Sequence, residues 1–105
     1  MRARICGQSS PSPSSEVTPH LTSCAAIVGN EDGAHNVSSQ IFQALNDVGW
    51  TIPAVAACYW VGEAMGSTDF KDLKETPKKV TETAGMVAAN AAHLARLLKE
   101  APYPG

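Results

Sequence analysis

The fold is decided by residues 21–35, LTSCAAIVGNEDGAH, in which a short apolar run ends in a glycine and leads into a polar turn. From Cys24 to Val28 the run is continuous in apolar residues, which is typical of a strand covered on both faces of a sheet. The turn from Gly29 to His35 is polar and contains two glycines. We therefore expect a buried strand over residues 21–28, followed by a loop and a helix.

The next two elements follow from the same kind of pattern. Apolar residues recur at helical spacing at Val37, Ile41, Leu45 and Val48. With Gly49 as a C-terminal stop, this spacing predicts a helix over residues 36–48. Residues 51–61 are again almost continuously apolar and predict a second buried strand, with Pro53 at its beginning or on a sheet edge.

A long final helix is predicted after a loop over residues 62–75. Thr76 supplies an N-cap and Pro77 a first-turn proline, and the helix stops before Pro102. Its apolar face consists of Val80, Ala84, Val87, Ala91, Leu94 and Leu98, at steps of four and three. The strand, helix, strand, helix order predicts an α/β fold with a parallel pair of strands. Two strands are few for a parallel sheet, so we expect the βαβα portion of a larger, doubly wound sheet.

The first twenty residues have a different composition from the rest. From Gly7 to Pro19 the chain is rich in Ser and Pro and nearly free of apolar residues. Such a segment cannot bury enough apolar surface to offset its ordering entropy, so we expect residues 1–20 to be a disordered leader and residues 21–105 to fold. The first buried strand then has an unpaired edge, from which we expect self-association.

Composition limits the class of protein. The chain has 105 residues, 44% apolar and 17% charged, which suits one small globular domain. A net charge of -2 offers no attraction for nucleic acid or for an anionic membrane. The three cysteines form no close pair, and no cluster of metal ligands is apparent. We therefore expect a cytoplasmic protein that binds neither a membrane nor nucleic acid and holds no metal.

The candidate site is the turn after the first buried strand, where open α/β sheets place their ligands. Its residues are Gly29, Asn30, Glu31, Asp32, Gly33 and His35. Glycines let the backbone approach a flat ligand closely, and the polar side chains line its edge. The alternative is a plain strand-to-helix turn in which Asp32 or Asn36 caps the helix.

Several stretches resemble one known family. They are residues 29–36, 44–49 (ALNDVG), 52–54 (IPA), 59–64 (YWVGEA) and 89–99 (ANAAHLARLLK). Together they resemble the fourth strand onward of flavodoxin-like NADPH-dependent FMN reductases. The resemblance covers residues 21–105 and implies the C-terminal half of a flavodoxin-like domain.

The resemblance carries its own functional expectations. It implies an FMN-dependent NAD(P)H oxidoreductase of the flavin or quinone reductase type, in which the turn at residues 29–35 contacts the flavin ring and NAD(P)H donates hydride. It also implies a fragment without the half that holds the flavin phosphate, since Arg2, Arg4, Ser9 and Ser10 have no preceding apolar strand and no following helix. We therefore expect this chain alone to bind FMN weakly or not at all. Tyr59 and Trp60 either border the substrate-binding space or pack against neighbouring residues at the edge of the sheet. The alternative function is a non-enzymatic α/β remnant or interaction module without a cofactor.

Overall fold

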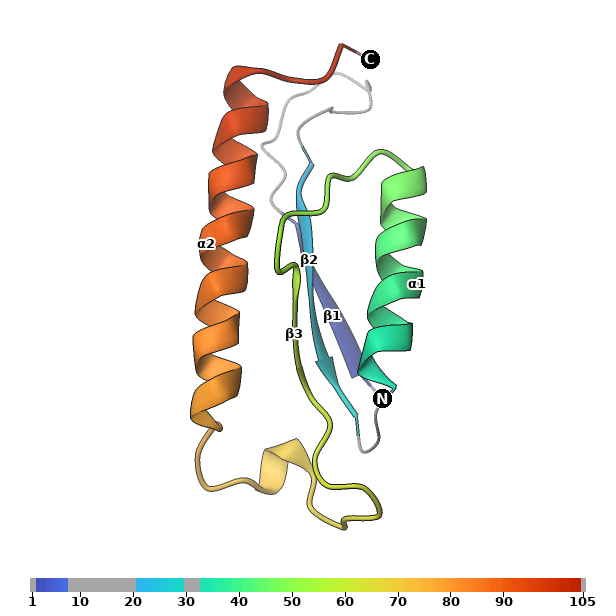
Figure 1. The fold of residues 1–105 in the computed structure, drawn as a ribbon, viewed down its shortest axis with the longest axis vertical. Coiled ribbons are helices and arrows are strands. Elements are labelled where there is room, and N and C mark those ends of the chain that lie inside the picture. The colour runs from blue at the N-terminus through green and yellow to red at the C-terminus, as the bar shows by residue number, and fades with distance from the viewer. Residues whose placement is uncertain (1, 8–20, 30–32, 105) are drawn as a thin grey trace.

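A three-stranded sheet with one helix on each face forms the centre of the protein (Figure 1). The computed structural model describes residues 2–7, 21–29 and 33–104. In chain order the elements are β1 (Arg2–Gly7), β2 (Ser23–Val28), α1 (Ala34–Asp47), β3 (Ala57–Trp60), the short 3₁₀ helix η1 (Phe70–Asp72) and α2 (Lys78–Glu100). None of the described helices is long and apolar enough to cross a membrane.

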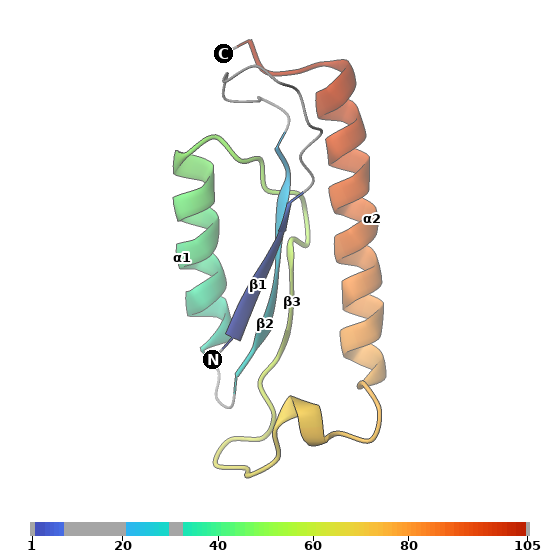
Figure 2. The same ribbon diagram turned by 180° about the vertical axis from the view of Figure 1, so that it is seen from behind.

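The parallel pair expected from the sequence is β2 and β3. Their register runs from Ala25 opposite Ala57 to Val28 opposite Trp60. Helix α1 packs against β2, and α2 packs mainly against β3 on the other face of the sheet (Figures 1 and 2). The predicted α/β fold class, with buried strands between two helical layers, is therefore confirmed.

Strand β1 corrects the expectation that the first twenty residues lack stable structure. Residues 2–7 pair antiparallel with β2, with Arg2 opposite Val28 and Gly7 opposite Ser23, and the sheet is mixed rather than purely parallel. The alternation of Arg and apolar residues at positions 2–5 has the period of a strand, and the edge of β2 offers unpaired N–H and C=O groups to it. Residues 8–20 lie outside the described residues.

The added strand also changes which edges of the sheet are open. Strand β2 lies in the middle, paired on both sides, so the open β2 edge that we expected is absent. Among the described strands, β1 and β3 form the edges. Self-association stays a prediction, but its cause cannot be an unpaired β2.

The buried core lies mainly between β2 and α1. Ala25 and Ile27 are almost fully buried and form a cluster with Ala34 at the start of α1. On the other face, α2 buries Val87 and Leu98, and the other members of its predicted apolar face are half-buried. The predicted apolar face of α2 is thus the one that contacts the sheet, whereas Val48 of the predicted first helix is 65% exposed.

The boundaries of α2 and β3 differ from the prediction. Pro77, not Thr76, is the N-cap of α2, and no side chain caps that helix. Strand β3 pairs regularly only over Ala57–Trp60, preceded by a single bridge between Thr22 and Thr51. Between Thr51 and the start of β3, Val55 has a φ of 52°, a left-handed conformation that interrupts the extended backbone.

Candidate functional site

The ends of β2 and β3 and the start of α1 meet at one end of the molecule (Figure 1). The Gly29 N–H donates to the Trp60 carbonyl at 3.0 Å, which extends the parallel ladder beyond β2. Gly33 is the N-cap of α1 and its carbonyl accepts a hydrogen bond from the Val37 N–H at 2.9 Å. The strand therefore ends where the sequence predicted, whereas the helix begins at Ala34, two residues earlier than predicted, so Asn36, an alternative cap, lies inside it.

A histidine and a tyrosine connect the start of α1 to β3. The His35 Nε2 and Tyr59 Oη atoms are 3.0 Å apart, within hydrogen-bonding distance. The two rings meet edge to face, with centroids 5.2 Å apart and an interplanar angle of 81°. Tyr59 is 38% exposed, and His35 is exposed as well. This pair therefore presents an aromatic and hydrogen-bonding surface to solvent at the edge of the sheet.

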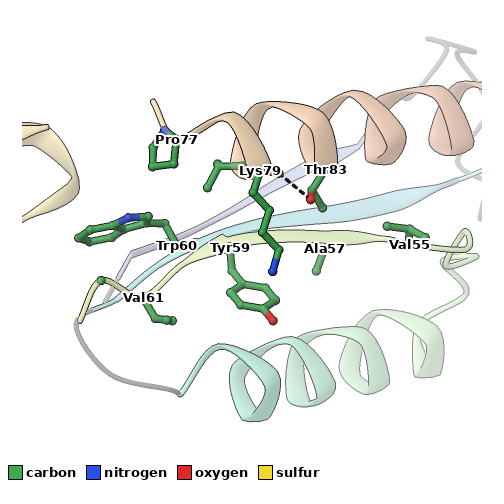
Figure 3. Close-up of a pocket in the computed structure, with 10 residues that line it drawn as sticks. Val55, Ala57, Tyr59, Trp60, Val61, Pro77, Lys79 and Thr83 are labelled. Carbon is green, nitrogen blue, oxygen red and sulfur yellow. Dashed lines mark hydrogen bonds between the residues drawn. The ribbon is translucent and has the colours of Figure 1, made fainter. Parts of the chain in front are cut away.

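An open groove follows the outer edge of β3 and has a volume of about 470 Å³ (Figure 3). It is lined by Val55, Ala57, Tyr59, Trp60, Val61, Gly62, Pro77, Lys79, Val80 and Thr83. In Figure 3 the Lys79 side chain extends from α2 across the edge of β3. Among the described residues Lys79 has no ion pair, so it is an uncompensated cation in a largely apolar groove.

The backbone of β3 also faces this groove. The carbonyls of Ala56 and Trp60 accept hydrogen bonds from β2. Because backbone groups alternate in direction along a strand, the N–H and C=O groups of Ala57 and Tyr59 point away from β2, toward the groove. The groove therefore offers backbone donors and acceptors beside the Tyr59 ring.

Trp60 is fixed on the other face of β3. Its ring contacts Phe70 of η1, with centroids 5.6 Å apart. Gly62 has a φ of +66°, and a Cβ at that position would lie 2.9 Å from the Trp60 Cη2 atom. The glycine thus lets the indole ring lie against the backbone. Of the two aromatic residues weighed from the sequence, Trp60 packs against its neighbours and Tyr59 stays exposed.

The structure places the predicted site residues in different environments. Gly29 is buried in the ladder, Gly33 caps α1 and His35 contacts Tyr59. Asn30, Glu31 and Asp32 lie outside the described residues. Sequence reasoning did not identify Tyr59 as the partner of His35. The available signal was that both positions flank the carboxyl ends of parallel strands, where side chains of the two segments come together.

Comparison with known proteins finds similarity to a flavin enzyme of another kind than expected. The chain is 37% identical over 78 residues to the 8-demethyl-8-aminoriboflavin-5'-phosphate synthase of Streptomyces davaonensis, a match that covers 73% of this chain and 30% of that enzyme. It also resembles the crystal structure of RosB with its bound intermediate, 8-demethyl-8-formylriboflavin-5'-phosphate. That match has a TM-score of 0.64 and 35% sequence identity, and covers 71% of this chain and 30% of RosB. No protein-family model matches the sequence.

These findings correct the functional reading of the sequence. The resemblance to NADPH-dependent FMN reductases was wrong, because the relative found is a synthase that modifies a riboflavin phosphate. The expected function as an FMN-dependent NAD(P)H oxidoreductase was wrong with it. The physical reason is that the matching stretches are strands, helices and their turns, which specify an architecture that serves several chemistries. The chain spans about 30% of the length of this curated relative.

Proposed function

We propose that this chain binds a riboflavin 5'-phosphate as part of an enzyme that modifies the flavin, with the flavin as substrate. The observation that carries the proposal is the match to RosB, at a TM-score of 0.64 and 35% identity, because the ligand named for that structure is a flavin phosphate. The sequence match to the Streptomyces davaonensis synthase agrees with this structural match, because the two comparisons found the same enzyme.

The site that suits the flavin ring is the end of the sheet at which β2, β3 and α1 meet. Open α/β sheets bind ligands beyond the carboxyl ends of their strands. Here that position offers close backbone approach at Gly33, which is half-buried, and an exposed aromatic ring at Tyr59. Aromatic rings favour offset or edge contacts with other flat rings, so Tyr59 suits an isoalloxazine.

The His35 and Tyr59 pair has a positioning role in this proposal. Their 3.0 Å contact fixes the Tyr59 hydroxyl relative to the first turn of α1. A hydroxyl both donates and accepts hydrogen bonds, and a neutral imidazole ring has one donor and one acceptor nitrogen, which matches the alternating carbonyl and nitrogen atoms along the flavin pyrimidine edge. The pair therefore orients the ring, and the relative's chemistry at position 8 takes place at the opposite, benzenoid end.

A fluorescence titration tests the proposal. Riboflavin 5'-phosphate and 8-demethyl-8-formylriboflavin 5'-phosphate are titrated into the purified chain while flavin emission is recorded. We expect saturable quenching with both ligands, because an adjacent Tyr ring and a dry backbone surface replace water around the isoalloxazine. No saturable change with either ligand would overturn the proposed function.

Matched variants then test the location. His35→Ala and Tyr59→Phe should each weaken flavin binding by about threefold to tenfold, the loss of one modest hydrogen bond. His93→Ala on the exposed side of α2 and Tyr103→Phe beyond its end change the same residue types at the far side of the fold and should leave binding unchanged. If the site variants and the control variants weaken flavin binding equally, the flavin binds elsewhere. A cytoplasmic location also remains a prediction.

A further inference from the structure

The outer edge of β3 has the backbone geometry to pair with one more strand. Among the described strands, β3 has a neighbour on one side only, which is β2. The carbonyls of Ala56 and Trp60 accept hydrogen bonds from β2, so the alternate residues, Ala57 and Tyr59, direct their N–H and C=O groups outward. Because such a row of outward groups is a template for an extended chain, this edge can receive an added strand.

The groove of about 470 Å³ lies along these same backbone groups (Figure 3). One wall is β3, and the other is formed by the first turns of α2, including Val80 and Thr83. The Tyr59 ring borders the groove on the opposite face of the sheet, where it contacts His35 of α1. Successive side chains of an added strand point to opposite faces. Alternate side chains would therefore contact α2 and the Tyr59 ring.

The charge in the groove is a single cation. Of the residues that line it, Lys79 alone is charged, and its side chain extends from α2 across the edge of β3 (Figure 3). Within the described part of the chain Lys79 belongs to no ion pair, whereas Lys78 pairs with Glu82 at 3.5 Å. A carboxylate on an added strand would therefore meet an unpaired lysine, and a cation would be repelled.

A second copy of this chain does not suit the edge. Antiparallel pairing of two β3 strands would place them about 4.8 Å apart. Helix α2 packs mainly over β3, and packed helices need about 8–10 Å between their axes, so the two copies of α2 would overlap. Strand β1 of a second copy would bring Arg2 and Arg4 beside Lys79. Association between two β1 strands leaves the groove free.

We propose that the outer edge of β3 binds an extended peptide segment with an acidic side chain, which adds a strand to the sheet and pairs its carboxylate with Lys79. The backbone groups of Ala57 and Tyr59 bind any extended chain, and the side chains of the groove provide the selectivity. An extended segment has no helix of its own above the sheet, so α2 does not obstruct it. The inference does not depend on flavin binding, although the Tyr59 ring borders both sites.

Peptide titrations followed by fluorescence anisotropy test this inference. The probes carry a neutral fluorophore and have about six residues, the usual length of a strand. In one probe Val alternates with Glu, and in the other Val alternates with Lys. We expect saturable binding of the glutamate peptide and about tenfold weaker binding of the lysine peptide. The glutamate peptide with every backbone nitrogen methylated donates no hydrogen bond and should not bind.

Two neighbouring lysines provide the matched variants. Lys79→Glu should weaken binding of the glutamate peptide by about threefold to tenfold and strengthen binding of the lysine peptide. Lys78→Glu makes the same charge change in the same turn of α2, at a side chain that is 89% exposed, and should leave both affinities unchanged. Ala57→Pro removes an outward N–H group without removing a β2 hydrogen bond, so it should weaken binding of both peptides.

Each other outcome overturns the proposal. If the glutamate peptide does not bind, Lys79 only shields the sheet edge. Equal binding of both peptides, or equal effects of the two lysine variants, would remove the acidic selectivity. Undiminished binding of the methylated peptide would exclude an added strand. If the glutamate peptide dissociates an associated form of the chain, a second copy occupies this edge instead.

Amide hydrogen exchange provides a readout that needs no variant, in case Ala57→Pro fails to fold. The amides of Ala57 and Tyr59 point outward in the free chain, and exchange at both should slow when the glutamate peptide binds. Unchanged exchange at both amides in the peptide-saturated wild-type chain would overturn the proposal.

Discussion

Replacing Gly62 by Ala tests how the end of β3 is held. The residue has a φ of +66°, a conformation that costs an L residue about 1–2 kcal/mol. The new Cβ would also lie 2.9 Å from Cη2 and 3.2 Å from Cζ2 of Trp60. The indole ring must then move from Phe70, which forfeits a ring contact of about 0.5–1.5 kcal/mol. We expect Gly62→Ala to lower the free energy of unfolding by about 2–3 kcal/mol.

Gly85→Ala is the matched control for this substitution. Gly85 lies inside α2, and a Cβ there meets no atom within 4 Å. Alanine in a helix interior is favoured over glycine by about 0.5–1 kcal/mol, so this variant should be more stable than the wild type. Urea unfolding followed by far-ultraviolet circular dichroism measures both. If Gly62→Ala is as stable as the wild type, or if Gly85→Ala is destabilised, the reasoning is refuted.

Three further predictions concern the core, the backbone and association. Ile27→Ala should lower the free energy of unfolding by about 2–5 kcal/mol in urea titration, because Ile27 is 1% exposed between β2 and α1; a loss below 1 kcal/mol would contradict this core. Val55→Asn should raise the thermal midpoint, because Asn tolerates the left-handed backbone and Val55 is already 49% exposed; a lowered midpoint would count against strain there. Sedimentation equilibrium should reveal concentration-dependent association through the open sheet edges, and a monomer at every concentration would refute it.

The parts of the fold that the sequence predicted are those with strong local patterns. The apolar run of β2 and the stripe along α2 each lie within one segment, so the local sequence pattern alone identifies them. The start of β3 was harder to predict from the sequence, because the left-handed Val55 that precedes it lies next to Ala54, whose carbonyl accepts a 2.7 Å hydrogen bond from Asn90. That contact joins residues far apart in the chain.

Strand β1 and the site illustrate the same limit. Arg2 and Arg4 are unusual residues for a strand beside a core, and only pairing with the edge of β2 explains their extended conformation. The contact between His35 and Tyr59 likewise depends on how a strand and a helix pack, which neither segment encodes alone. The reaction type was missed for another reason, because turns and helices specify a fold and leave the chemistry to a few side chains.

The most direct test of flavin binding is a nuclear magnetic resonance titration of the ¹⁵N-labelled chain with riboflavin 5'-phosphate. The binding site proposed here predicts progressive shifts of the amide signals of Gly29, Gly33, His35 and Tyr59. The amide signals of the second half of α2, which lies toward the opposite end of the sheet, should not shift (Figure 1). Unchanged spectra at millimolar flavin, or shifts confined to α2, would contradict the account.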